Sequence, residues 1–325
     1  MRSNNPAHMK PKIQSGQPLV YVLLGLCVFV FSCTPRNGKP QDTTPAPKPF
    51  HLPQIPAVCS TAEQRAEYLV EHYWDHFDFR DTSLILRPEI TEQAFVDFID
   101  VLPYVEDPKP GIGTMMDRAS TDSAMFVCFW DMAEKYLYDP NSPMRNEELY
   151  IPVLEYILRS QKVDSLDKLR PRYQLEMALK NRPGMPAADF TYTTESRSGV
   201  KTRHMLHNLR SEYTLLFFNN PDCYDCARTQ EYIVVSPVFA KWQQQGLSIL
   251  AIYPDTDLDL WRKAIYPQEW INGYDAAQTI REQQLYDLKA IPTLYLLDRD
   301  KRVILKDTPV ERIEQWAMVK WTKKK

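Results

Sequence analysis

The sequence has no excess of basic residues. Its 39 Lys and Arg residues are outnumbered by 42 Asp and Glu residues, which gives a formal net charge of −3. A nucleic-acid-binding domain normally carries a basic footprint, so the composition argues against a nucleic-acid partner. The lysines at residues 323–325 are interpreted as a solvated tail.

The N-terminal part also lacks an apolar run long enough to cross a membrane. Residues 20–31 are apolar and follow Arg2, Lys10 and Lys12, but a spanning helix needs about 20 such residues. A short apolar segment behind positive charges is typical of an export signal. We therefore predict that residues 1–32 are a signal peptide and that the mature protein works outside the cytoplasm.

Cysteine is scarce, and there is one Cys-x-x-Cys pair, Cys223-Tyr-Asp-Cys226. A structural zinc site needs four ligands, and there is no second such pair to complete one. Attachment of a c-type haem needs His directly after the second cysteine, where this chain has Ala227. Two interpretations of the pair remain, a redox-active pair and an inert or structural one.

The position of the pair favours redox chemistry. Residues 214–218 are an apolar, strand-like run, and residues 219–222 can form a turn before Cys223. A helix that begins at Cys223 would place its sulfur among unpaired N–H groups, which favour the thiolate. Because the thiolate is the attacking species, we predict that Cys223 and Cys226 form a redox-active disulfide.

Residues 30–33, Val-Phe-Ser-Cys, resemble the lipobox of bacterial lipoproteins. The resemblance implies that Cys33 is diacylated and becomes the mature N-terminus, so that a lipid anchors the protein to a membrane of the cell envelope. No acidic residue follows Cys33, which by analogy with lipoprotein sorting favours the outer membrane facing the periplasm. The alternative is an ordinary signal peptide with an incidental cysteine.

Residues 33–56 are rich in proline and polar side chains. Such a composition cannot bury a core and favours extended, solvated backbone, so we predict a tether. The remaining length suggests two domains. We expect the first over residues 57–182 and the second over residues 183–325.

The first domain is predicted to be all-helical. Ser60-Thr-Ala-Glu63 has the pattern of a capping box, and apolar residues recur at helical spacing from Ala62 to Phe77. Similar signals follow, and they lie at residues 91–102, 125–137, 147–158 and 166–179. No function can be assigned to this domain from its pattern.

The second domain is predicted to be α/β, with a central mixed sheet covered by helices. Short β-rich runs alternate with helical segments, and they lie at residues 190–193, 214–218, 247–253, 293–297 and 302–306. Gly246 is a plausible end for the helix before the third run.

The second domain resembles the thioredoxin superfamily, in particular thiol-disulfide oxidoreductases of the TlpA and ResA type. Cys223 and Cys226 follow the first core strand, and Ile291-Pro292-Thr293 opens a later one. The resemblance implies that Cys223 is the nucleophile, that Cys226 resolves the mixed disulfide, and that Pro292 is a cis-proline which shapes the substrate groove. It also implies that the Ile291 backbone contacts the substrate.

The same resemblance implies protein disulfides as substrates, an unidentified thiol as reductant and no cofactor. Residues 67–78 are also similar to an uncharacterised helical domain that precedes thioredoxin-like domains in bacterial lipoproteins. A different class of function stays open, in which this is a partner- or glycan-binding lipoprotein and the thioredoxin-like domain is a scaffold with little turnover.

This chain departs from the thioredoxin pattern around the cysteines. Many thioredoxins have a buried acid six residues before the first cysteine, where this chain has Phe217. Asp222, Tyr224 and Asp225 are expected to modulate the pair. Both carboxylates oppose a thiolate by like-charge repulsion, from which we predict the poise of a reductant or isomerase.

The other cysteines leave one more question open. Cys59 and Cys128 would lie in an oxidising compartment and could form a structural disulfide, but two free thiols fit the sequence equally well. His72 and His76 have the i, i+4 spacing of metal ligands. Because no third ligand can be assigned, we predict no metal site.

Overall fold

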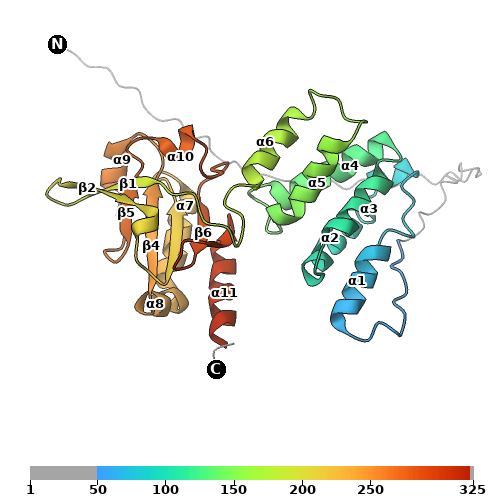
Figure 1. The fold of residues 1–325 in the computed structure, drawn as a ribbon, viewed down its shortest axis with the longest axis horizontal. Coiled ribbons are helices and arrows are strands. Elements are labelled where there is room, and N and C mark those ends of the chain that lie inside the picture. Colours follow the sequence, from blue (N-terminus) through green and yellow to red (C-terminus); the bar gives the residue numbers. More distant parts are fainter. Residues whose placement is uncertain (1–49, 323–325) are drawn as a thin grey trace, which may run out of the picture. The chain divides into compact units, whose positions relative to one another are not determined.

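The first part of the chain folds into helices only. The structure is a computed structural model that describes residues 50–322 (Figure 1). The helices are α1 (Ala62–His72), α2 (Thr91–Val101), α3 (Lys109–Ala119), α4 (Ser123–Ala133), α5 (Glu147–Arg159) and α6 (Leu169–Ala178). Three shorter helical segments lie between them, η1 (Thr82–Leu86), η2 (Leu102–Tyr104) and η3 (Glu134–Tyr138). The prediction of an all-helical region before an α/β region is confirmed.

The capping box at the start of α1 was predicted one residue too early. Thr61, and not Ser60, is the N-cap residue, and its hydroxyl accepts a hydrogen bond from the Gln64 amide at 3.2 Å. The Gln64 side chain accepts in return from the Thr61 amide at 3.3 Å. Gln64 therefore takes the place expected for Glu63, because glutamine can close the same pair of hydrogen bonds.

Other helix boundaries also differ from the predictions. Helix α1 ends at His72, and the apolar residues up to Phe77 continue in turns. Helix α3 was not predicted, because Pro110, Gly111 and Gly113 hide its pattern. A Cβ atom at Gly111 would lie 2.4 Å from Val70 Cγ1, so close packing against α1 requires glycine there.

Aromatic rings fill the middle of the helical region. The Trp74 ring centroid lies 5.3 Å from that of Phe98 and 5.3 Å from that of Phe129. Phe77 and Phe79 complete this set of five buried rings, which we call the aromatic centre. Most of these ring pairs meet edge to face, a favourable geometry for aromatic contacts.

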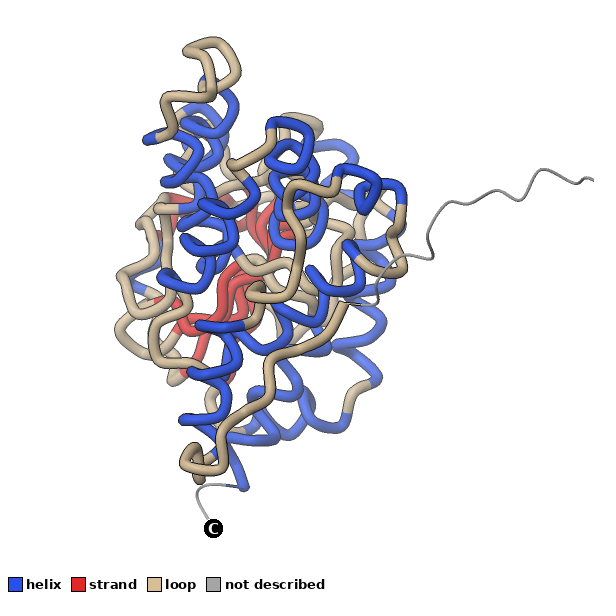
Figure 2. Tube along the Cα trace, turned by 90° about the vertical axis from the view of Figure 1, so that its right-hand side faces the viewer, coloured by secondary structure: helices blue, strands red, loops and turns tan. Residues whose placement is uncertain are grey.

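The second part of the chain is built on one mixed sheet (Figure 2). Its seven strands have the order β2-β1-β5-β4-β3-β6-β7. Strands β3, β4 and β5 run parallel, whereas β6 is antiparallel to β3. The strands are β1 (Thr191–Glu195), β2 (Lys201–Met205), β3 (Tyr213–Phe218), β4 (Leu247–Tyr253), β5 (Ile271–Tyr274), β6 (Thr293–Leu297) and β7 (Val303–Lys306). The predicted central mixed sheet is confirmed.

Side chains of the central strands alternate between the two faces of the sheet. In β3, Leu215 and Phe217 belong to one apolar cluster, whereas Leu216 and Phe218 belong to another. The first face is covered by helices α7 (Tyr224–Val235), α8 (Pro237–Gln244) and α11 (Val310–Thr322), and α10 (Thr279–Glu282) contributes to the second. Helix α9 (Leu258–Lys263) packs Trp261 against Tyr253 of β4 and Tyr274 of β5. Burial on both faces explains why β3 is a continuous apolar run.

Two strands, β2 and β5, were not predicted from the sequence. Strand β2 is polar and largely exposed, so it has no apolar alternation to detect. Strand β5 has four residues and contains Gly273, where a Cβ atom would lie 2.9 Å from the Tyr192 ring. Gly246 has a φ of +103° just after α8 and its C-cap residue, which confirms the predicted helix end.

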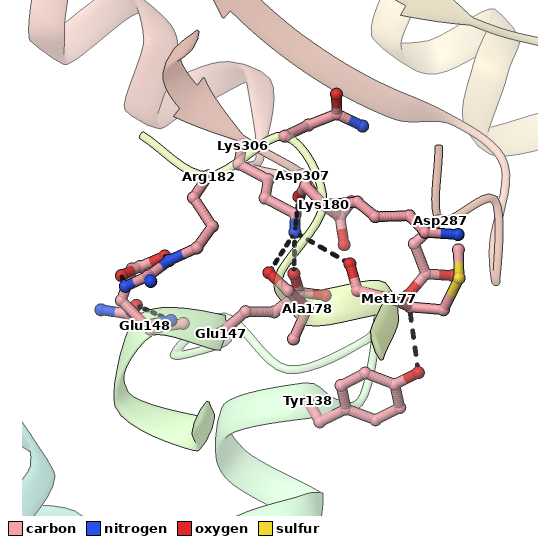
Figure 3. Close-up of polar contacts among 12 residues, drawn as sticks. Tyr138, Glu147, Glu148, Met177, Ala178, Lys180, Arg182, Asp287, Lys306 and Asp307 are labelled. Atoms are coloured by element: carbon pink, nitrogen blue, oxygen red, sulfur yellow. Dashed lines mark hydrogen bonds and ion pairs between the residues drawn. The ribbon is translucent and has the colours of Figure 1, made fainter. Parts of the chain in front are cut away.

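The two parts meet at a cluster of buried charges that we call the charged junction, namely Glu147, Asp287, Lys289, Lys306 and Asp307. Figure 3 shows Lys306 of β7 beside Glu147 of α5 and the last turn of α6. The Lys306 ammonium lies 2.8 Å from Glu147 Oε2, as an ion pair without hydrogen-bond geometry. It donates to the carbonyl oxygens of Met177, Ala178 and Lys180 at 3.3, 2.8 and 2.5 Å. Lys306 thereby caps the C-terminus of α6.

Several predictions fall on residues outside 50–322. The signal peptide, the lipid site Cys33 and most of the tether lie there and stay predictions. The described residues fall within one compact unit, Pro47–Lys325. Among the helices of residues 50–322, none has the length and hydropathy that a membrane span needs.

Candidate active site

Cys223 lies at the start of a helix, as predicted from the sequence. Strand β3 ends at Phe218, a turn follows, and Cys223 is the N-cap residue of α7. The Cys223 Sγ atom accepts a hydrogen bond from the Cys226 amide at 3.1 Å. This amide is one of the donors that a helix leaves unpaired in its first turn. The helix N-terminus therefore favours negative charge on the half-buried sulfur of Cys223.

Cys226 differs from Cys223 in its surroundings. Its side chain is buried, and its Sγ atom accepts from the Asn220 amide at 3.5 Å. Burial, followed by the hydrogen bond with Cys223, raises the pKa of the Cys226 thiol above its ordinary value. The pair thus consists of an accessible sulfur that can attack first and a buried sulfur that stays protonated until it is needed.

The loop before β6 brings a backbone carbonyl to the cysteines. The Ile291–Pro292 peptide bond is cis, as the resemblance implied. The Ile291 carbonyl oxygen lies 3.4 Å from Cys223 Sγ, within hydrogen-bonding reach of the thiol. Thr293 then enters β6, where it pairs with Phe218 at the end of β3. The sheet register therefore places residues 291 and 223 side by side.

No carboxylate occupies the interior position below the pair. Phe217 is fully buried there and packs its ring 6.1 Å from that of Trp270. Half-buried Tyr266 lies near Cys226 instead, and its hydroxyl donates to Oδ1 of the buried Asn219 at 2.5 Å. Burial, and then the neighbouring Cys226, raises the pKa of Tyr266. No pattern in the sequence indicates that Tyr266 reaches this place from the segment after α9.

The three residues expected to modulate the pair lie on the surface around it. Asp222, Tyr224 and Asp225 are exposed. Within residues 50–322 neither carboxylate lies in an ion pair, and the Arg228 guanidinium is 6.0 Å from the Tyr224 ring centroid. Their charges are therefore open to solvent, where they act on the thiols with weak, salt-screened forces.

A solved structure that is similar over most of the chain decides the family. A thioredoxin-like protein from Bacteroides caccae is 48% identical to this chain, and the match covers 84% of this chain and 99% of that protein with a TM-score of 0.77. The chain is a thioredoxin-like protein. Its sheet, its Cys-x-x-Cys turn and its cis-proline loop are those of the thioredoxin-like part of the molecule.

Further matches cover the two parts separately. Residues 32–181 match a domain of unknown function, DUF5106. The C-terminal domain of an uncharacterised protein from Bacteroides fragilis is 46% identical over 42% of this chain and 98% of its own, with a TM-score of 0.40. The thioredoxin domain of a thiol-disulfide oxidoreductase from Bacteroides vulgatus is 17% identical over 42% of this chain and 96% of its own, with a TM-score of 0.37. A comparison with curated proteins finds no match.

The remaining cysteines lie away from the thioredoxin-like site. Cys59 and Cys128 are free thiols in this structure, as are Cys223 and Cys226, so a disulfide between Cys59 and Cys128 stays a prediction. Cys59 lies in the turn before α1, whereas Cys128 lines a hollow between α2 and α4.

The two histidines do not share one helix, because His72 is the last residue of α1 and His76 lies in the turn that follows. His72 Nδ1 lies 2.9 Å from Asp75 Oδ2, and Asp75 also accepts from Arg118 at 2.5 Å. No group of three or more His, Cys, Asp or Glu side chains within residues 50–322 is arranged to hold a metal.

Proposed function

We propose that this protein is a thiol-disulfide oxidoreductase that reduces or isomerises disulfides of other proteins. The observation that carries the proposal is the position of Cys223 Sγ at the N-terminus of α7 and 3.4 Å from the Ile291 carbonyl beside the cis-proline. This places a nucleophilic sulfur next to a backbone edge that can hold a peptide.

The reaction needs two exchange steps. The Cys223 thiolate attacks one sulfur of the substrate disulfide, the S–S bond breaks, and the other substrate sulfur leaves as a thiolate that takes up a proton. A mixed disulfide now joins Cys223 to the substrate. Cys226 loses its proton and attacks Cys223 Sγ, which releases the second substrate thiol. Two electrons pass to the substrate, and a thiol reductant must restore the pair.

The raised pKa of Cys226 bears on the second step. A protonated Cys226 does not attack Cys223 early, so the mixed disulfide persists long enough for a substrate thiol to attack it instead. This favours isomerisation as well as reduction. The like charges of Asp222 and Asp225 weakly oppose the thiolate that the N-terminus of α7 favours, and this repulsion supports a reducing potential. A measured potential near −120 mV, that of a strong periplasmic oxidant, would contradict this poise.

We also propose that the protein acts outside the cytoplasm, attached to the outer membrane by a lipid on Cys33 and facing the periplasm. The lipobox-like residues 30–33 and the proline-rich tether support this location. Radiolabelled palmitate should be incorporated into the wild type and not into a Cys33→Ala variant. Labelling of both, or of neither, would reject the lipid site.

Insulin reduction in the presence of dithiothreitol tests the activity. The wild type should accelerate precipitation of the insulin B chain, Cys223→Ala should not, and Cys128→Ala, a matched change outside the pair, should behave as the wild type. Equal rates for the wild type and Cys223→Ala would reject the enzyme and favour a binding protein. A Cys226→Ala variant should accumulate mixed disulfides at Cys223, whose partners can be identified by mass spectrometry.

A further inference from the structure

Two polar residues meet just beyond the carboxyl ends of two neighbouring strands, beside the redox pair. Strands β3 and β4 run parallel, with Phe218 opposite Ile252. Asn220 lies two residues after the end of β3, and Asp255 lies two residues after the end of β4. Because parallel strands end at the same edge of the sheet, the two side chains come together, and Asn220 Nδ2 donates to Asp255 Oδ2 at 2.9 Å.

Both backbone groups and both side-chain groups of Asn220 form hydrogen bonds. Its amide donates to Cys226 Sγ at 3.5 Å, and its carbonyl oxygen accepts from the Cys223 amide at 3.0 Å. Its side-chain oxygen accepts from the Asp222 amide at 3.0 Å, and its side-chain nitrogen donates to Asp255. Because side chain and backbone are held together, the side chain fixes the direction in which the Asn220 amide points.

Asp255 is itself held by two residues at the start of α10. Arg281 Nε lies 2.8 Å from Asp255 Oδ1, which leaves Oδ2 to Asn220. Gln278 Nε2 donates to the Asp255 carbonyl oxygen at 3.2 Å. A partly exposed ion pair adds little stability by itself, but this one sets the orientation of the carboxylate that accepts from Asn220.

The contact with Asn220 opposes the other influences on Cys226. Burial and the hydrogen bond with Cys223 raise the pKa of the Cys226 thiol. The Asn220 amide lowers this pKa, because a hydrogen bond donated to a thiolate stabilises the charged form. The other titratable groups near Cys226 are Cys223, Asp225 and Tyr266. Since Cys226 must lose its proton before it attacks, the amide acts at the moment when the negative charge appears.

We propose that Asn220 is a positioning residue for the second exchange step, in which its amide stabilises the Cys226 thiolate, and that Asp255 holds Asn220 in place for this. The inference rests on the proposed function, which assigns the second step to Cys226. In that step Cys226 gives its proton to water, its sulfur bonds to Cys223 Sγ, and the substrate sulfur leaves with the electron pair. Without either side chain the amide is free to turn away from Cys226, and the step should slow.

The small aromatic disulfide DTNB separates the two steps. Attack by Cys223 releases one thionitrobenzoate and leaves the other in a mixed disulfide, and attack by Cys226 then releases the second. The reduced protein, with serine in place of every cysteine outside the pair, is mixed with one equivalent of DTNB in a stopped-flow instrument. The first release is an internal reference, because Cys223 Sγ accepts its hydrogen bond from the Cys226 amide and not from Asn220.

Asn220→Ala and Asp255→Ala should each slow the second release about threefold and leave the first unchanged. Loss of a hydrogen bond to a thiolate raises the thiol pKa by about one unit. This leaves about tenfold less thiolate, and the greater nucleophilicity of the remaining thiolate offsets about threefold of that loss. The double variant should be no slower than Asn220→Ala, because Asp255 acts through Asn220.

An effect of charge alone would have the opposite sign at Asp255. Removal of a carboxylate eases formation of a nearby thiolate, so Asp255→Ala would then speed the second release. Asp255→Asn removes the same charge but keeps an oxygen that can accept from Asn220, and should release at nearly the rate of the wild type. The matched control is Asp259→Ala, an exposed carboxylate of α9 that pairs with Arg262, which should change neither release.

An unchanged second release in Asn220→Ala and Asp255→Ala, a faster one in Asp255→Ala, or equal slowing of both releases would overturn the inference. Asp255→Asn as slow as Asp255→Ala would overturn the role of its hydrogen bond. If circular dichroism shows that Asn220→Ala does not fold, the two Asp255 variants decide. A wild type that completes both releases but does not reduce insulin would instead reject the proposed function.

Discussion

The aromatic centre of the helical region and the charged junction with the thioredoxin-like part stabilise the molecule in different ways. The aromatic centre consists of rings that exclude water, and its contacts have no strong preference for a single partner. The charged junction joins named atoms, such as Lys289 Nζ and Glu147 Oε1. Ion pairs taken out of water gain little net stability, but they fix geometry when their partners are in place.

Helix α5 takes part in both regions, which makes the comparison direct. Its first residue, Glu147, lies in the charged junction, whereas Leu149, Val153, Leu154 and Ile157 belong to the apolar core of the helical region. Apolar contacts therefore stabilise the helix itself. The Glu147 carboxylate joins the helix to the loop that contains the cis-proline, through Lys289. Variants at the two places should separate the contribution of apolar contacts to stability from that of the buried charges.

The largest effect is expected in the aromatic centre. Phe129→Ala removes a fully buried ring and leaves a cavity, which should lower the free energy of unfolding by about 3 to 5 kcal/mol. Urea denaturation followed by far-UV circular dichroism measures it. Val127→Ala, an exposed change on the same helix, should cost within about 0.5 kcal/mol. A loss below about 1 kcal/mol for Phe129→Ala would mean that the core repacks.

A smaller loss is expected in the charged junction. Glu147→Gln removes the charge that both Lys289 and Lys306 face, and should cost about 3 kcal/mol, the low end for breaking a buried ion pair. The control is Glu176→Gln, whose pair with Lys180 is exposed and worth about 0.5 kcal/mol or less. Equal costs for both variants would show that Glu147 is not acting as a buried charge.

The dependence of stability on acid pH further distinguishes the charged junction from the aromatic centre. Burial would raise the pKa of the Glu147 carboxyl, but Lys289 and Lys306 outweigh it and hold that pKa below its ordinary 4.5. Its stabilisation is therefore present above pH 4.5 and lost as the pH falls through the folded pKa. The difference in unfolding free energy between the wild type and Glu147→Gln should shrink below pH 4.5, whereas that for Phe129→Ala should not change.

Protonation of Asp287 should change the free energy of unfolding in the opposite direction to protonation of Glu147. Burial raises the pKa of its carboxyl above the ordinary 3.8, so protonation as the pH falls through the folded pKa relieves a cost. An Asp287→Asn variant should lose more stability than the wild type between neutral pH and pH 3.8. Parallel pH profiles for the two proteins would contradict this sign.

The smallest difference is expected between one thiol of each part, Cys128 and Cys226, in how their reactivity depends on pH. Burial is the main cause that raises the pKa of both Cys128 and Cys226. In a Cys223→Ser background, both thiols should react with iodoacetamide at rates that still increase above pH 9.0, because only the thiolate reacts. Mass spectrometry of peptides measures each rate. A plateau below pH 9.0 for Cys226 would contradict its protonated resting state.

Much of the fold and the centre of the site could be predicted from the sequence, because their signals are local. The apolar run of β3, the turn after it and Cys223 lie within a dozen residues, so the strand, the turn and the helix start could be inferred together. The cis-proline loop needed the resemblance to a family, since its closeness to Cys223 depends on the pairing of β3 with β6.

What could not be predicted depends on contacts between distant residues. Glu147 and Lys289 are 142 residues apart, and charged side chains are ordinarily expected on the surface. Tyr266 reaches the neighbourhood of Cys226 from a segment with no regular pattern. The polar strand β2 has no apolar face from which a strand could be predicted. In each case the decisive partner is set by the fold and not by its neighbours in the chain.

The cap on α6 by Lys306 also sets an order of events during synthesis. The Ala178 carbonyl accepts from a lysine that lies 128 residues later in the chain. At a synthesis rate of about 5 to 20 residues per second, the end of α6 leaves the ribosome roughly 6 to 26 seconds before its cap exists. The nascent helical region is therefore expected to fold around its rings while its last turn frays, and to close that turn only when the final strand of the sheet arrives.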